Sequence, residues 1–455
     1  MKPPLPMLLA CAALLMPAPA RAGTIYVDCD NTTAPWDGTQ ANPYQFIRDG
    51  LNNADPADTV QVADGTYTGA LNKNLDFGGK AITLRSENGP GVTIIDCGND
   101  GRGFDFHLDE GPDSVLDGFT ITNGSAPFAG GAISCIESSP TITNCTLTGN
   151  AADNAGGIYC ESSNAVIADC TVSDNTAGLF GGGIYCVIGN PTIFNCTITG
   201  NVAPIDGGGL VFDTTTATVA NCTVSANDAG QGDGVVCYLG SNPIITNCIL
   251  WANLGEALYA DAASTPVVTY SCVQDDDPDD GIIYPGAGNI DDDPLFVTGP
   301  SGDYYLSQTA AGQLADSPCV DTGSDIAANL GLDTRTTRTD HLADAGTVDM
   351  GYHSPRCPGG LPGDVDGNGV VDGLDLTAVL SAWETVPGDP LWNANADLDC
   401  NGVIDGLDLT AVISNWTPAA PAATPEELPL RWATANERGV GAGSVRRGCG
   451  TVRRR

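Results

Sequence analysis

The sequence predicts an all-β solenoid followed by a small helical unit, and three patterns lead to this fold class. About five copies of one unit repeat between Gly130 and Asn253. A fixed period of this length is typical of solenoids, in which each copy stacks on the next. Within a copy, apolar and polar residues alternate as in strands with one buried face, and an acidic segment followed by a helical pattern occurs twice near the C-terminus. The period shows most clearly in cysteines 25, 26, 26 and 26 residues apart: Cys145, Cys170, Cys196, Cys222 and Cys248.

Residues 1–22 have the pattern of a secretory signal peptide. Lys2 precedes the apolar run Leu5–Met16, and Ala20-Arg21-Ala22 provides small residues for cleavage. We therefore expect a mature chain that starts near Gly23 and is secreted or held at the cell surface. No later apolar run approaches the roughly 18 residues that a membrane span needs, so we expect no transmembrane segment in the mature chain.

The charge of the chain restricts its partners. The formal net charge is −39, which argues against nucleic-acid binding because phosphate contacts require concentrated Lys and Arg. Such a charge suits an extracellular protein or one that gathers divalent cations. No Lys or Arg occurs between Gly103 and Thr334.

Residues 23–129 are predicted to form an N-terminal cap and the first, less regular coils, since terminal repeats are usually atypical. An amphipathic helix is expected at 43–54, with Phe46, Ile47 and Leu51 on one face. A turn is expected at 64–67. Strands are expected at 24–28, 59–63, 82–85, 92–96 and 115–122.

Residues 130–300 are predicted to form the regular coils, each with three short strands. Ile158 and Cys160 illustrate the alternation that should build an interior of Ile, Val, Leu and Cys ladders. Five coils at about 4.8 Å per rung make a segment of roughly 24 Å.

Two columns of Asn and Asp recur at the bends of these coils. Asn tolerates left-handed turns and bonds local backbone, and amides stacked in register can bond one another. We therefore interpret the columns as structural, and the glycosylation sequons within them as incidental. The first column contains Asn144, Asp169, Asn195, Asn221 and Asn247, and the second contains Asn150, Asn175, Asn201, Asn227 and Asn253.

The repeat resembles the right-handed parallel β-helix family, whose fold is that of the pectate lyases. The resemblance covers roughly residues 24–300, and Thr59–Gly69 is similar to the usual N-terminal opening of that family. These motifs specify fold rather than activity.

Residues 301–357 are predicted to close the solenoid. Ser317–Gly323 and Val348–Tyr352 resemble a tail module that often ends secreted β-helix proteins. Cys319 and Cys357 bracket this module, and we expect a disulfide between them. The Pro and Gly residues of Cys357–Pro362 predict a linker.

Residues 363–417 contain two twelve-residue calcium loops that lie 33 residues apart, each followed by a helix. Side-chain oxygens stand at positions 1, 3, 5, 9 and 12, glycine at 6 and a backbone carbonyl at 7. Carboxylates this close repel one another unless a cation neutralises them. The predicted ligands are Asp364, Asp366, Asn368, Val370, Asp372 and Asp375 in the first loop, and Asp397, Asp399, Asn401, Val403, Asp405 and Asp408 in the second.

This pair of loops resembles the type I dockerin family. The resemblance implies two bound Ca²⁺ ions and docking onto cohesin modules of a cell-surface or multi-enzyme scaffold. Positions 10 and 11 are Gly373-Leu374 and Gly406-Leu407, where many dockerins are polar, and Cys400 replaces a glycine of the first loop. A cohesin-like protein, another surface scaffold or self-association therefore all stay open as partners. The composition of residues 418–455 predicts a disordered tail that is Pro/Ala-rich and basic.

Catalysis in the β-helix is disfavoured by composition. A polysaccharide lyase of the resembled fold needs a Lys or Arg base, which the regular coils lack, and His107 is the only histidine before His341. The Gly-His-Gly motif of the hydrolases of this fold is also absent.

One outward strip of the coils still allows a sugar site. Glu161 and Asp213 share a column and lie two rungs apart, or roughly 9.6 Å, near the upper end of the spacing of inverting glycosidases. Tyr159 and Tyr185 point outward beside them, where rings can stack on sugars. The alternative, which we favour over catalysis, is a solvated face with scattered acids and tyrosines.

The cysteines also allow two interpretations. Pairs ten or eleven residues apart can cross one coil as disulfides, which leaves Cys222 odd because Phe212 holds its partner position. Alternatively, buried thiols pack as small hydrophobes, which we favour because disulfide geometry is demanding. The possible pairs are Cys135/Cys145, Cys160/Cys170, Cys186/Cys196 and Cys237/Cys248.

Together these patterns predict a secreted, cell-surface or scaffold-attached protein whose rod binds glycan or protein and whose dockerin-like module attaches it. The alternative is a polysaccharide-degrading enzyme, a glycosidase rather than a lyase. A third possibility is a spacer or adhesin without a small ligand.

Overall fold

The computed structural model describes residues 22–275, 283–299, 302–340 and 342–355, and shorter pieces of the C-terminal part: 365, 371, 373–383, 385, 391, 393, 396, 404 and 406–414. The expected signal peptide, most of the calcium loops, Cys357, Cys400 and the basic tail lie outside the described residues. No helix in the described part of the chain is both long and apolar enough to cross a bilayer.

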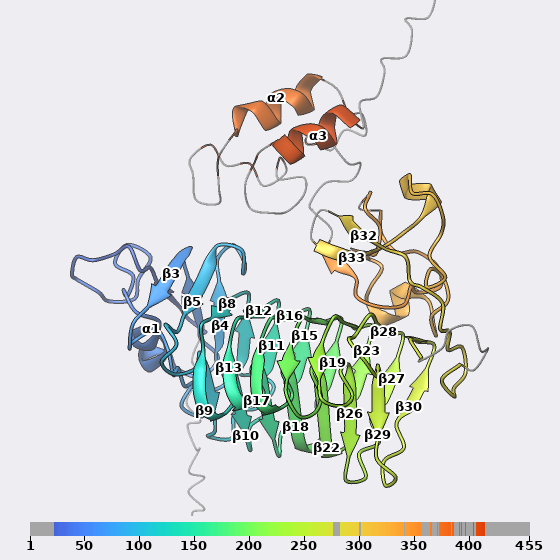
Figure 1. Ribbon diagram of the computed structural model, residues 1–455. Coiled ribbons are helices and arrows are strands. Elements are labelled where there is room, and N and C mark those ends of the chain that lie inside the picture. The colour runs from blue at the N-terminus through green and yellow to red at the C-terminus, as the bar shows by residue number, and fades with distance from the viewer. Residues whose placement is uncertain are drawn as a thin grey trace, which may run out of the picture. The chain divides into compact units, whose positions relative to one another are not determined.

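The chain from β1 to β31 forms a right-handed solenoid of parallel strands with about eight turns, as the repeat predicts (Figure 1). Each turn contributes strands to the same sheets, so every strand pairs with its equivalents in the turns before and after it. The ten-stranded sheet contains β1 (Thr24–Val27), β2 (Thr59–Val62), β4 (Thr83–Ser86), β7 (Val115–Asp117), β11 (Thr141–Thr143), β15 (Val166–Ala168), β19 (Thr192–Phe194), β23 (Thr218–Ala220), β27 (Ile244–Thr246) and β30 (Val267–Thr269).

The next two sheets complete the expected three strands per turn. The nine-stranded sheet contains β3 (Gly65–Thr68), β5 (Thr93–Asp96), β8 (Thr120–Thr122), β12 (Thr146–Thr148), β16 (Thr171–Ser173), β20 (Thr197–Thr199), β24 (Thr223–Ser225), β28 (Ile249–Trp251) and β31 (Cys272–Val273). The seven-stranded sheet contains β6 (Phe104–Phe106), β10 (Ile133–Ile136), β14 (Ile158–Glu161), β18 (Ile184–Gly189), β22 (Leu210–Thr215), β26 (Val235–Tyr238) and β29 (Leu258–Ala260).

The structure adds a fourth strand to five turns, so the expectation of three was too low there. After the bend at the second Asn column the backbone stays extended long enough to pair once more before the glycines that open the next copy. This five-stranded sheet contains β9 (Ser125–Ala129), β13 (Ala151–Asn154), β17 (Thr176–Phe180), β21 (Val202–Ala203) and β25 (Asp228–Ala229).

The N-terminal part differs from expectation in three places. Helix α1 (Ile47–Asn53) begins four residues later than expected, because Tyr44 exchanges main-chain hydrogen bonds with β1 instead. Residues 65–68 form β3 rather than a turn, since they pair with β5. Gly118, with a φ of 86°, bends the expected strand at 115–122 into β7 and β8.

The interior contains the predicted ladders. Ile158 and Cys160 are buried, whereas Tyr159 and Glu161 between and after them are half-buried. In the second Asn column each amide Nδ2 donates to the Oδ1 of the next amide at 3.0 Å, for example from Asn175 to Asn201. The first column has left-handed backbone with φ of 50–55°, as predicted for Asn at a tight bend.

The cysteines stack along the solenoid and not across one coil. The thirteen described cysteines carry free thiols, and those of neighbouring turns contact each other. Cys222 shows how a thiol stabilises the bend through hydrogen bonds to the main chain. Its Sγ donates to the Ala220 carbonyl at 3.3 Å and accepts a hydrogen bond from the Cys196 amide at 3.4 Å. This stacking from turn to turn favours the thiol ladder over disulfides within one coil.

After the last turn, the chain forms an irregular segment, residues 302–355, which we call the C-terminal segment. A hairpin of β32 (Phe296–Gly299) and β33 (Gly302–Leu306) leads into it, and it contains β34 (Arg335–Thr336), β35 (Ser354–Pro355) and 3-10 turns at Thr309–Ala311 and Ala327–Leu330.

In the C-terminal part of the chain, the helices α2 (Gly373–Ser381) and α3 (Gly406–Ser414) share one small apolar cluster. Val371 and Ile404 hold the same position of the two repeated halves, as do Val379 and Val412, and all four are buried. The duplication seen in the sequence therefore builds a common core.

Candidate functional site

The outward strip predicted from the repeat lies on the seven-stranded sheet. Tyr159 on β14 is directly opposite Tyr185 on β18, and Glu161 pairs with Val187, which pairs with Asp213 on β22. The glycine pairs that open each copy keep these strands in register, so one column of outward side chains is repeated turn after turn. The structure thus brings all four predicted residues onto one face.

Each outward tyrosine lies beside one of the predicted acids. The Tyr159 hydroxyl donates to Glu161 Oε2 at 3.0 Å, whereas the Tyr185 hydroxyl lies near the Asp213 carboxylate, which accepts the Thr214 hydroxyl at 2.8 Å. The two rings meet edge to face with centroids 5.7 Å apart. Burial and the neighbouring carboxylate raise the pKa of Tyr185 to about 12, and the same causes raise the pKa of Tyr159. Both hydroxyls therefore stay protonated, and that of Tyr159 holds the Glu161 carboxylate in place.

An apolar rim borders the tyrosines on the five-stranded sheet and its connections. The Phe180 ring lies 6.2 Å from that of Tyr185. Phe128 on β9 is 76% exposed, and Leu179 and Ile205 are also exposed. Carboxylates, tyrosine hydroxyls and an apolar rim on one face provide the mixture that sugar rings require.

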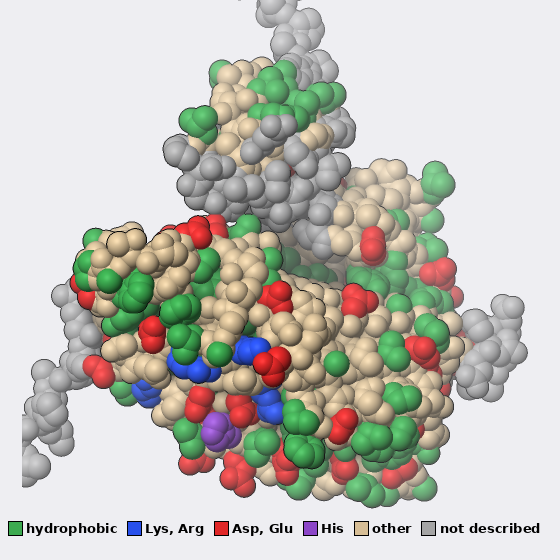
Figure 2. Space-filling view, turned by 60° about the vertical axis from the view of Figure 1, so that its left-hand side comes forward, with side chains coloured by type: hydrophobic (Ala, Val, Ile, Leu, Met, Phe, Trp, Pro, Cys, Tyr) green, Lys and Arg blue, Asp and Glu red, His purple; other side chains and the backbone are tan. Residues whose placement is uncertain are grey.

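Sequence reasoning missed a charged cluster at the proximal end of the same sheet. Asp105 on β6 shares the outward column of Tyr159, with Ser134 between them. Arg102 Nη1 lies 2.8 Å from Asp105 Oδ1, and His107 Nδ1 lies 3.7 Å from Asp105 Oδ2. The Phe-Asp-Phe-His pattern at 104–107 could have revealed the strand, but it lies 29 residues before its equivalent, outside the 25–26-residue period. Figure 2 shows Lys and Arg side chains gathered in one area of the surface, beside a histidine and several acids.

A groove of ≈410 Å³ lies between the first turns and the C-terminal segment. Asn144 and Asp169 of the first Asn column lie at its lining, with Arg85 and Glu87 from the N-terminal turns and Tyr352 from the C-terminal segment. The groove is lined by both acidic and basic side chains. Asp169 already forms an ion pair with Arg335, whose Nη2 lies 2.7 Å from Asp169 Oδ2.

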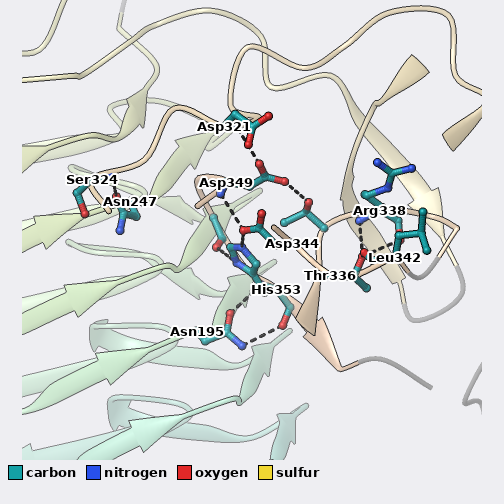
Figure 3. Close-up of polar contacts among 12 residues, drawn as sticks. Asn195, Asn247, Asp321, Ser324, Thr336, Arg338, Leu342, Asp344, Asp349 and His353 are labelled. Carbon is teal, nitrogen blue, oxygen red and sulfur yellow. Dashed lines mark hydrogen bonds and ion pairs between the residues drawn. The ribbon is translucent and has the colours of Figure 1, made fainter. Parts of the chain in front are cut away.

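A buried polar cluster joins the C-terminal segment to the solenoid (Figure 3). His353 donates its main-chain N–H to Asn195 Oδ1 at 2.7 Å and accepts a bond from Asn195 Nδ2 at 2.9 Å. Its ring Nε2 lies 2.8 Å from Asp344 Oδ2. The Ser324 amide donates to Asn247 Oδ1 at 2.8 Å. The first Asn column thus provides the surface on which the C-terminal segment docks.

Three carboxylates converge in this cluster: those of Asp321, Asp344 and Asp349 have oxygens within 4.8 Å of one another. Asp349 accepts hydrogen bonds from the Asp321 amide at 2.7 Å and from the Thr337 hydroxyl, and its own amide donates to Asp344 at 3.0 Å. Burial, together with the charge of Asp344, raises the pKa of Asp349 to about 6. These hydrogen bonds to main-chain amides account for the convergence of the carboxylates. We therefore interpret the cluster as structural: it joins the C-terminal segment to the solenoid.

Of the twelve predicted calcium ligands, the structure describes Asp375 and Asp408. Each stands in the first turn of its helix, α2 or α3, and each is completely buried. Asp375 Oδ1 accepts the Val365 amide at 2.8 Å. A carboxylate at the last position of the loop fits the oxygen ligand that a calcium loop requires there. The other ten ligands lie outside the described residues.

Family models match two parts of the chain. The model of the right handed beta helix region matches residues 62–224, and that of the dockerin type I domain matches residues 362–415. None of the curated proteins matches the chain.

Two solved structures have a related fold. A pectate lyase, Pel9A, is 12% identical, with a TM-score of 0.37 over 72% of this chain and 96% of its own. A rhamnogalacturonan lyase is 14% identical, with a TM-score of 0.37 over 55% of this chain and 73% of its own. Neither likeness bears on the chemistry of this chain.

Proposed function

Because the chain is a right-handed parallel β-helix protein with a C-terminal type I dockerin domain, we propose that it is a scaffold-attached glycan-binding protein. The glycan binds the seven-stranded sheet, and the dockerin domain attaches the protein. The signal-like N-terminus and the acidic composition support a secreted or cell-surface location.

The observation that carries the glycan site is the arrangement of Tyr159, Glu161, Tyr185 and Asp213 on one face. Edge-to-face packing of the two rings and the Tyr159–Glu161 hydrogen bond hold the rings before any ligand arrives, so little side-chain entropy is lost on binding. The second lone pairs of the carboxylates accept sugar hydroxyls. Sugar rings lie across the tyrosines, against the apolar rim of Phe128 and Phe180.

The same set supports binding better than hydrolysis. An inverting glycosidase needs a protonated acid opposite a free base. Here Glu161 already accepts a hydrogen bond from the Tyr159 hydroxyl, and Asp213 accepts one from the Thr214 hydroxyl. The competing function is a glycosidase with Glu161 and Asp213 as its two carboxylates, and their shared column is the observation that favours it.

The dockerin domain supplies attachment through two Ca²⁺ ions, one per loop. The oxygen-rich donor set, the glycine at position 6 and the buried Asp375 and Asp408 all support this ion and this number. Leu374 is 63% exposed at a position where many dockerins are polar, and Leu380 and Ile413 are also exposed. These side chains suit an apolar contact with a cohesin-like or other surface scaffold protein.

The function is tested by incubating the full chain with a panel of plant and algal polysaccharides, then measuring both retention on the glycan and release of sugars. We expect retention without new reducing ends or unsaturated products. Release of reducing ends that disappears in Glu161→Gln would establish the glycosidase instead. No retention on any glycan would contradict glycan binding and favour the role of a spacer or adhesin without a small ligand.

A further inference from the structure

Two buried cysteines from distant parts of the chain face each other at the end of the solenoid. Cys272 begins β31, the last strand of the nine-stranded sheet, and Cys319 belongs to the C-terminal segment. Both are completely buried, in one apolar cluster with Ile249, Leu306 and Met350. The Cys272 Sγ donates to the Asp292 carbonyl at 3.2 Å and lies in contact with the Cys319 thiol.

The position of Cys272 on its strand is unlike that of the stacked cysteines. It continues the outward column that contains Thr146, Thr223 and Ile249, not the inward ladders. Thr146, in an uncovered turn, is half-buried, whereas Thr223 and Ile249 are buried. An outward cysteine is therefore buried at this turn because the C-terminal segment covers it, and that segment presents Cys319 to it.

The cysteines of the ladder from Cys145 to Cys248 have a task at the bend that Cys272 does not share. Each of them donates its S–H to the carbonyl two residues earlier, as Cys248 does to Thr246 at 3.2 Å. In the last turn Ser271 takes over, donating to Thr269 at 2.9 Å and accepting the Cys248 amide at 3.0 Å. The ladder thus ends on a serine, and the next residue, Cys272, instead donates to the Asp292 carbonyl and contacts Cys319.

We propose that Cys272 and Cys319 form a disulfide that bonds the C-terminal segment to the last turn of the solenoid. The inference extends the proposed extracellular location, since such bonds persist in oxidising compartments. It competes with the expected bond between Cys319 and Cys357, the second of which lies outside the described residues.

The reaction joins the two Sγ atoms by thiol–disulfide exchange with a small disulfide such as oxidised glutathione. One thiolate attacks that disulfide and releases one glutathione thiol, and the second cysteine then displaces the other. The two cysteines lose two protons and two electrons, and the oxidant becomes two thiols. Contact with Cys319 and burial raise the pKa of Cys272 far above that of a free thiol, so the bond should form before the segment closes over it.

The full chain is refolded in a glutathione redox buffer, unreacted thiols are alkylated under denaturing conditions, and the digest is analysed by mass spectrometry without reduction. An Asp-specific protease is needed, because no Lys or Arg separates Cys272 from Cys319. We expect one cross-linked peptide pair containing these two residues. Cys272→Ser and Cys319→Ser should each abolish it and leave the remaining partner alkylated, whereas the ladder variant Cys222→Ser should retain it.

A second readout keeps the proposal testable if a serine variant folds poorly. Reduction should lower the melting temperature of the wild type by several degrees and change that of Cys319→Ser little. Alkylation of both cysteines in the refolded wild type, or a bond between Cys319 and Cys357, would overturn the proposal. Either result leaves the glycan-binding proposal intact, since no residue of the strip takes part.

Discussion

Single residues show which parts of the site could be predicted. Tyr159 and Glu161 were predictable because alternation fixes the face of each residue and the period fixes its neighbour. The bond between their side chains was not, since it depends on rotamers. The role of Asp349 and His353 in joining the C-terminal segment to the solenoid could not be predicted either. Their contacts with Asn195 and Asp344 bring together distant parts of the chain.

Asp349 allows a prediction about pH. Its folded pKa of about 6 exceeds the ordinary value of about 4, so the folded chain binds more protons than the unfolded chain between these pH values. The stability from this group is present at about pH 4 and is lost as the pH rises through about 6. Asp349→Asn should therefore flatten the dependence of the free energy of unfolding on pH in this window.

The measurement is urea unfolding at pH 4, 5, 6 and 7, with exposed Asp303→Asn as the control. The wild type and the control should lose stability across the window, and Asp349→Asn should lose less. An equal loss in all three proteins would show that Asp349 is ionised throughout.

At the scale of elements, the period predicted the stacking and the register, and the structure confirms both. The fourth strand was missed because short extended pieces such as β21 lack an alternating pattern and pair only because their neighbours in adjacent turns are extended too. The later start of α1 has a similar cause, since Tyr44 joins β1. Pairing between turns decides what local propensity leaves open.

The second Asn column should be a large source of stability. Asn201 Oδ1 accepts from the amide and the side chain of Asn175, and its Nδ2 donates to the Val172 carbonyl at 2.9 Å. Asn201→Ala leaves these buried groups without partners, at about 1–3 kcal/mol for each unsatisfied group. We expect a loss of about 3 kcal/mol or more in the free energy of unfolding.

Urea denaturation compares this variant with Asn164→Ala, at an exposed asparagine in the turn that follows β14. The control should lose less than about 1 kcal/mol. Similar losses in the two variants would mean that the ladder is not a special source of stability.

At the scale of the whole molecule, the sequence predicted a solenoid and a dockerin domain because both repeat. The docking of the C-terminal segment on the first Asn column was not predictable, because its contacts are not periodic. Composition turned attention from catalysis to binding as a hypothesis, and the position of Arg102 beside Asp105 shows that the irregular first turns bring a cation to the same sheet.

The dockerin domain should bind two Ca²⁺ ions, and its helices should depend on them, because the loops gather carboxylates that repel without a cation. Isothermal titration of the calcium-stripped full chain should give a stoichiometry near two. Asp375→Ala and Asp408→Ala should each remove one site and leave the other. A stoichiometry of two in both variants would contradict the assigned ligands.

The most direct test of the glycan-binding face compares the affinities of the wild type and three variants for the polysaccharide that retains the wild type. Tyr159→Ala and Tyr185→Ala should each weaken binding at least tenfold, because each removes one of the two rings on which the sugar stacks. Tyr26→Ala, which removes a half-buried tyrosine from β1 of the ten-stranded sheet, is the matched control and should bind as the wild type does. Equal affinities in all variants would place the glycan elsewhere and contradict the proposed function.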